Sequence, residues 1–204
     1  MRRTVTGTAA LLAACLFAAI AAAEPASSLK PAEEFGTIRD ETARSVALFE
    51  EMGRVLTHPR CLNCHPVGDT PLQGDGMEPH RPAVTRFDES GMGPPAMRCT
   101  TCHGRENFAF VGAEGSIPGH EPWHLAPKEA GWVGVPLGEI CRQLKDPERN
   151  GGRTLDEIHE HNATDGLVGW GWRPGEGRTP VPGTQAQFGE LTRAWIETGA
   201  HCPE

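Results

Sequence analysis

Two copies of one pentapeptide constrain this chain more than any other feature of its sequence. CLNCH occupies positions 61–65 and CTTCH positions 99–103. In each copy two thiols lie three positions apart and a histidine follows at once. This arrangement can bond the two vinyl groups of a porphyrin and give an imidazole to its iron. We therefore predict two covalently attached haem c groups, with thioethers at Cys61, Cys64, Cys99 and Cys102 and with His65 and His103 as proximal iron ligands.

Paired cysteines are also the pattern of a zinc ribbon and of a redox-active dithiol. The gap between Cys64 and Cys99 is longer than the roughly 15–20 residues of a zinc ribbon, and zinc has no use for a histidine after each pair. A thioredoxin-like site needs a strand before the cysteines and a helix after them, whereas Pro66 and a Gly/Pro-rich stretch follow the first pair. Haem attachment is the interpretation that explains both histidines.

The composition favours an interior filled by a cofactor. The chain has 25 Gly, 18 Pro and no Tyr, and aromatic residues make up 6% of it. Few large side chains are therefore available for an ordinary core. Two flat apolar macrocycles would supply much of the missing buried surface, and we expect folding to depend on haem.

The segment 1–23 has the organisation of a secretory signal peptide. Two arginines precede an apolar run over 9–23, which ends in the small residues that suit cleavage. We predict export to the periplasm and no stable membrane insertion of the mature protein. A lipoprotein anchored at Cys15 is the alternative.

The rest of the chain divides into a flexible N-terminal segment at 24–36 and one domain at 37–204. Apolar residues at three- and four-residue steps predict amphipathic helices, and Thr154 with Glu157 forms a capping box before one of them. No strand is evident. The predicted fold class is all-α with high loop content, in which cytochrome c-like helices wrap around two covalent haems. Helices are expected at 37–56, 137–146, 154–161 and 184–198, and loops at 66–95 and 112–138.

Two cysteines remain outside the pentapeptides and the signal peptide. In an oxidising compartment Cys141 and Cys202 are expected to form a disulfide, worth about 4 kcal/mol on the chain-entropy model. Free buried thiols are the alternative.

Each iron needs a second axial ligand opposite its proximal histidine. Loop residues fold over a haem more easily than residues inside a helix. We therefore favour His80 for the first haem, with Met77 as the alternative, and His124 for the second haem, with His120 and Met97 as alternatives. Two bis-histidine irons would suit an electron carrier, whereas an open position would permit peroxide chemistry.

The stretch DGLVGWGWRPGEGRTPVPG at 165–183 is the other conspicuous feature. One hypothesis packs Trp172 against a haem and pairs Arg173 with haem propionates, because guanidinium groups bind carboxylates well. The alternative places the tryptophans in an ordinary core and the arginines in solvent. We favour the haem contact for Trp172 and a solvated side chain for Arg178.

Several stretches resemble a group of small exported di-haem c-type cytochromes of Gram-negative bacteria, whose members are often labelled isoquinoline-type oxidoreductase subunits. They are HPRCLNCHPVGDTPLQGD, PPAMRCTTCHG, WHLAP, CRQLKDPERNGG and LVGWGWRPGEGRTPVPG, and together they cover most of the chain after position 56.

This resemblance implies electron transfer through haems ligated by His65 and His103. The implied partners are a periplasmic dehydrogenase as donor and a respiratory-chain acceptor. The net charge of −8 argues against nucleic acid as a partner. A di-haem enzyme of the peroxidase type, with one open iron coordination site, is the alternative function.

Overall fold

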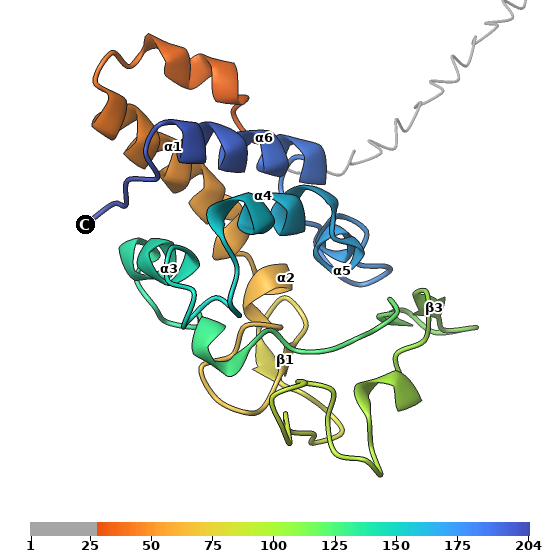
Figure 1. The fold of residues 1–204 in the computed structure, drawn as a ribbon. Helices are drawn as coiled ribbons and strands as arrows, with labels where there is room; N and C mark the ends of the chain where they lie inside the picture. Colours follow the sequence, from red (N-terminus) through yellow and green to blue (C-terminus); the bar gives the residue numbers. More distant parts are fainter. Residues whose placement is uncertain (1–27) are drawn as a thin grey trace, which may run out of the picture.

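The computed structural model describes residues 28–204, in which the helices gather in one region and the segment 63–131 forms a second, loop-rich region (Figure 1). Helix accounts for 40% and strand for 5% of the described residues, so this part of the chain is mostly helical with much loop. Within the described residues, no helix is long and apolar enough to cross a membrane. The predicted signal peptide at 1–23 and Cys15 lie outside these residues.

The two longest helices pack against each other at the centre of the core. α1 spans Glu41–Leu56 and α6 spans Gln185–Glu197, close to the limits that the apolar periodicity predicts. The same periodicity brings apolar side chains of both helices to one face. Phe49 and Trp195 are fully buried there, with their ring centres 5.0 Å apart.

Shorter helices complete the helical region. The capping box predicted from Thr154 and Glu157 is confirmed: the threonine hydroxyl accepts from the Glu157 N–H at 3.3 Å, and the Glu157 carboxylate accepts from the Thr154 N–H at 2.8 Å. The helix that begins at this capping box, α4 at Leu155–Thr164, packs on α6. Asn162 of α4 donates a hydrogen bond to the Thr192 hydroxyl of α6 at 3.2 Å. The other shorter elements are α3 at Leu137–Leu144, α5 at Gly166–Gly169 and a 3-10 turn, η4, at Trp170–Trp172.

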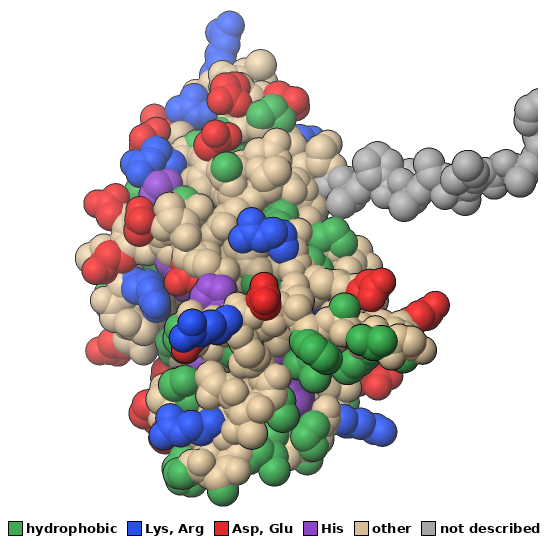
Figure 2. Space-filling model, turned by 90° about the vertical axis from the view of Figure 1, so that its right-hand side faces the viewer, with side chains coloured by type: hydrophobic (Ala, Val, Ile, Leu, Met, Phe, Trp, Pro, Cys, Tyr) green, Lys and Arg blue, Asp and Glu red, His purple; other side chains and the backbone are tan. Residues whose placement is uncertain are grey.

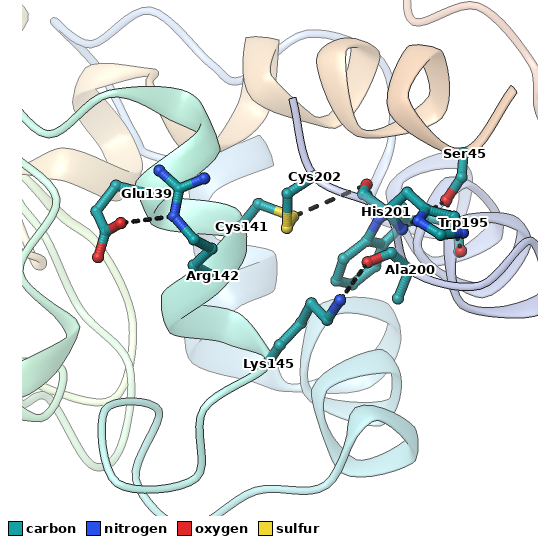
Figure 3. The surroundings of a disulfide bond; sticks show 9 residues. All are labelled: Ser45, Glu139, Cys141, Arg142, Lys145, Trp195, Ala200, His201 and Cys202. Atoms are coloured by element: carbon teal, nitrogen blue, oxygen red, sulfur yellow. Dashed lines mark hydrogen bonds and ion pairs between the residues drawn. A yellow bond between two sulfur atoms is a disulfide. The ribbon is translucent and has the colours of Figure 1, made fainter. Parts of the chain in front are cut away.

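A disulfide ties α3 to the end of the chain (Figure 3). It joins Cys141 to Cys202, which confirms the pairing predicted from the cysteine count. Three hydrogen bonds hold the same C-terminal segment: the N–H of His201 donates to Ser45 Oγ, its carbonyl accepts from Trp195, and Lys145 donates to the Ala200 carbonyl. The C-terminal segment is therefore anchored to the core through Ala200 and Cys202.

Part of the segment 24–36, for which the sequence predicts flexibility, lies against the helices. A 3-10 helix, η1, spans Ala32–Thr37, and both Leu29 and Phe35 are buried in the main hydrophobic cluster. These two apolar side chains are the reason that the segment packs.

The segment 63–131 contributes no buried side chain to that hydrophobic cluster, which passes from Leu62 directly to Trp132. No strand was expected here, but the structure has two small antiparallel hairpins. Their strands have two residues each and are joined by turns with glycines at positive φ, such as Gly74 and Gly112. Strands of two residues are too short to show the alternation of polar and apolar residues that predicts a strand. The hairpins pair β1 at Leu72–Gln73 with β2 at Glu78–Pro79, and β3 at Phe108–Ala109 with β4 at Ser116–Ile117.

The surface reflects the same division. Figure 2 shows hydrophobic side chains gathered on the lower part of the molecule, below a more highly charged upper part. Among the described residues, every exposed large hydrophobic side chain belongs to the segment 63–131, namely Val67, Phe87, Met97, Phe108, Phe110 and Val111. This segment therefore buries few large apolar side chains, Leu125 among them, and exposes several others.

Candidate functional site

The first pentapeptide is held by a short helix that continues from α1. This helix, α2, spans Pro59–Leu62, and its last residue is buried in the core. The N–H of His65 donates to the carbonyl of Cys61 at 3.1 Å, so one helical turn brings thiol and imidazole to the same side. Local helical hydrogen bonds therefore set the backbone geometry of the first pentapeptide.

The His65 ring is fixed in orientation. Its Nδ1 lies 2.7 Å from the carbonyl oxygen of Ala130, and its ring stacks on Trp132 with centres 3.5 Å apart. A carbonyl only accepts hydrogen bonds, so Nδ1 carries the proton and Nε2 keeps a lone pair. A histidine held in this way is prepared to bind a metal through Nε2.

The second pentapeptide repeats this design on a different element. A 3-10 helix, η2, spans Cys99–Thr101, and the N–H of His103 donates to the Cys99 carbonyl at 2.9 Å. His103 Nδ1 lies 2.8 Å from the carbonyl oxygen of Pro118, and the ring stacks on Trp123 at 4.7 Å. Both histidines thus have a backbone acceptor at Nδ1 and a parallel indole.

Removal from water sets the protonation of these groups. Burial raises the pKa of Cys61 to about 12 and that of Cys64 to about 11. Burial also lowers the pKa of His65 to about 3, and lowers the pKa of His103. The imidazoles are therefore neutral, which is the form that coordinates a metal.

A cavity opens beside each pentapeptide. The volume of the first is about 1170 Å³ and that of the second about 1500 Å³, both including the open solvent at the mouth of the cavity. The first cavity reaches into the helical core, and two buried polar atoms in its wall, Trp132 Nε1 and Gln143 Oε1, have no hydrogen-bond partner. Its apolar wall includes Leu56, Leu144, Ile158 and Phe188, and its polar wall Arg149, Arg153 and His161.

The second cavity is lined by loops and by the two hairpins. His80 also lines it, with its ring centre 5.9 Å from that of His103. Arginines from separate parts of the chain also reach this cavity, namely Arg81, Arg98 and Arg178.

The two cavities share a wall made of Arg60, Cys64, His124 and Trp170. Trp170 stands edge-on to Trp123 with ring centres 4.9 Å apart, and it donates to Asn107 at 2.8 Å. The cavities therefore lie directly beside one another, separated by single side chains.

Arg60 places a buried charge in this shared wall. Its side chain is 1% exposed and donates to Asp75 at 2.6 Å, while its Nε has no partner. Asp75 also accepts from the Thr179 hydroxyl at 2.6 Å, which joins the β1–β2 turn to the loop before α6. Burial lowers the pKa of Arg60, and Asp75 opposes this effect.

The structure groups the predicted distal ligands differently from the sequence. His80, expected at the first pentapeptide, lines the cavity of the second, and His124, expected at the second, lies in the wall between the two. The alternatives Met77, Met97 and His120 line neither cavity.

In the tryptophan-rich stretch too, the residues that line the cavities differ from those that the sequence favoured. Trp170 lines both cavities, whereas Trp172 packs on Phe188 with ring centres 5.9 Å apart and lines neither. Arg178 reaches the second cavity, and Arg173 reaches neither.

Sequence reasoning missed His161, which lines the first cavity from the last turn of α4. A signal was present, since His161 and Asp165 are four positions apart and a helix brings such residues together. Their side chains lie 3.5 Å apart.

No set of three or more His, Cys, Asp or Glu side chains in residues 28–204 is grouped so that it could hold a metal ion. The four pentapeptide cysteines therefore do not converge as the ligands of a zinc ribbon do. Comparison of the chain with models of known families, with curated proteins and with solved structures found no match.

Proposed function

We propose that this protein is an exported electron carrier with two covalently attached haem c groups. One observation carries the proposal: each pentapeptide has a histidine with a free Nε2 beside its own cavity, and the two cavities share a wall. Two redox groups separated by single side chains suit the passage of electrons through the chain better than binding of one small molecule.

The residues present fit a porphyrin at each pentapeptide. A haem is a flat apolar ring with two carboxylates, so its site needs apolar walls, cations at the edge and a fixed imidazole. The first cavity is lined by apolar side chains of the core together with Arg149 and Arg153. The second is lined by side chains of the hairpins together with Arg98 and Arg178. Bound haem supplies one-electron redox chemistry at its iron.

The protein groups would then bind, orient and exclude water. The cysteines would hold the rings covalently, the Ala130 and Pro118 carbonyls would keep the two imidazoles in one tautomer, and Trp170 would fill the space between the rings. The donor would be a periplasmic dehydrogenase and the acceptor a component of the respiratory chain.

Mass spectrometry and optical spectra test this function. Protein made in a host that attaches haem c should carry two haems that survive denaturation, and its ferrous spectrum should not change under carbon monoxide. Absence of covalent haem would overturn the proposal. Rapid binding of the gas by one haem would favour the peroxidase-type alternative, which needs an open iron.

A further inference from the structure

The irons that these pentapeptides would hold need ligands on their second faces, and two histidines are placed to supply them. We propose that His80 is the distal ligand opposite His103 and that His161 is the distal ligand opposite His65. This inference rests on the proposed function, since it assigns ligands within the two haem sites. Neither pairing follows from distance along the sequence.

The separation of His80 and His103 matches a shared metal ion. Two imidazoles on opposite sides of one ion have ring centres about 6 Å apart, because each metal–nitrogen bond is about 2 Å long. The observed separation of the ring centres is 5.9 Å. His80 Nδ1 lies 2.9 Å from the Pro82 carbonyl oxygen, so its Nε2 is left free in the same way as that of His103.

The β1–β2 hairpin explains how His80 reaches the second cavity. The N–H of Leu72 donates to the carbonyl of Asn63 inside the first pentapeptide, and the Asn63 side chain donates to the Gly74 carbonyl. His80 follows β2 directly, and its N–H donates to the Pro71 carbonyl at 3.1 Å. The hairpin is thus anchored at the first pentapeptide and delivers a histidine to the second.

His161 is oriented by a carboxylate. Its Nδ1 lies 3.5 Å from Asp165 Oδ2, and Asp165 is itself held because its other oxygen caps α5 by accepting from the N–H groups of Leu167 and Val168. Metal-bound histidines commonly use one ring nitrogen for such a carboxylate and the other for the metal. His161 lines the same cavity as His65.

Two other histidines of the region serve as comparisons. His124 lies in the wall between the cavities, and its Nδ1 is held by the neighbouring Leu125 carbonyl at 2.9 Å. His159, on the same helix as His161, is half-buried, lines neither cavity and pairs with Arg193. His124 is therefore the natural competitor, and His159 the matched control.

The test compares His80→Ala, His161→Ala, His124→Ala and His159→Ala in protein that carries both haems. The readouts are carbon monoxide uptake by the reduced protein and the high-spin ferric signal in electron paramagnetic resonance. We expect no uptake by the unchanged protein and by His159→Ala, one molecule per protein for His80→Ala and for His161→Ala, and two for the double variant.

Two outcomes overturn the assignment. One is an unchanged spectrum in His80→Ala or His161→Ala, and the other is a new carbon monoxide site in His124→Ala. If an alanine variant does not accumulate, His80→Met and His161→Met replace it. Each should give one thioether-to-iron band and raise one of the two potentials, and absence of both changes contradicts the assignment. A chain without covalent haem would overturn the proposed function instead.

Discussion

The two pentapeptide regions have the same local geometry but different support. In both, the histidine N–H bonds to the first cysteine carbonyl and Nδ1 bonds to a distant carbonyl. The first region continues from α1 and buries Leu62 in the core, whereas η2 in the second region buries no residue. Hydrogen bonds within the five-residue motif therefore set its local geometry. The stability of the surrounding segment depends on contacts outside the motif, such as burial in the core.

The largest expected effect follows from removing the proposed haem attachment in one region at a time. Replacing Cys61 and Cys64 by alanine should cost the helical region about 5 kcal/mol or more, because the first cavity is walled by core side chains and would be left empty. Thermal unfolding followed by far-ultraviolet circular dichroism measures this loss.

The matching double variant, Cys99→Ala with Cys102→Ala, should preserve most of the helical signal, since the segment 63–131 contributes no buried side chain to the main hydrophobic cluster. Limited proteolysis should then cut within that segment, because under the proposed function its order would depend on the second haem. Equal losses of helical signal in the two double variants would contradict the division into two regions.

The next effect concerns the disulfide. Replacing Cys141 and Cys202 by alanine should lower the free energy of unfolding by about 4 kcal/mol, because the bridge closes a long loop with a sequence separation of 61. Urea unfolding of the helical region measures the change. The environment of the second cavity should be unaffected, so a shift in the spectrum of the second haem would show that the regions are more tightly coupled than proposed.

The ion pair between the buried Arg60 and the exposed Asp75 should affect both regions. Asp75→Asn leaves the Arg60 guanidinium buried without its counter-charge, and we expect a loss of about 2 kcal/mol, because solvent already screens the exposed carboxylate. Arg60→Met removes the buried charge itself and should cost less. Glu121→Gln is a matched control, because its pair with Arg105 is exposed and should change stability by less than about 1 kcal/mol. A smaller loss in Asp75→Asn than in the control would refute this role.

The smallest effect should be confined to the first region. Thr154→Ala removes the hydroxyl of the capping box before α4 and should cost about 1 kcal/mol. Hydrogen exchange should become faster in the first turn of α4 and stay unchanged near η2. Thr154→Ser keeps the hydroxyl and should behave as the unchanged protein.

Much of the helical region could be predicted because its signals are local. The apolar spacing of α1 and α6 and the Thr154 capping box act within a few residues, so the sequence shows them directly. The disulfide followed from counting, since only two cysteines remained. The hairpins gave no such signal, because two-residue strands between glycine-containing turns are too short to alternate.

The proposed attachment chemistry follows from the sequence alone, because both cysteines and the histidine of each pentapeptide lie within one turn of backbone. The pairing of distant side chains is not. His80 reaches His103 through a hairpin anchored at the other pentapeptide, and Trp170 rather than Trp172 faces the cavities because η4 turns it there. Such contacts depend on how separate elements pack, and spacing along the chain carries no information about them.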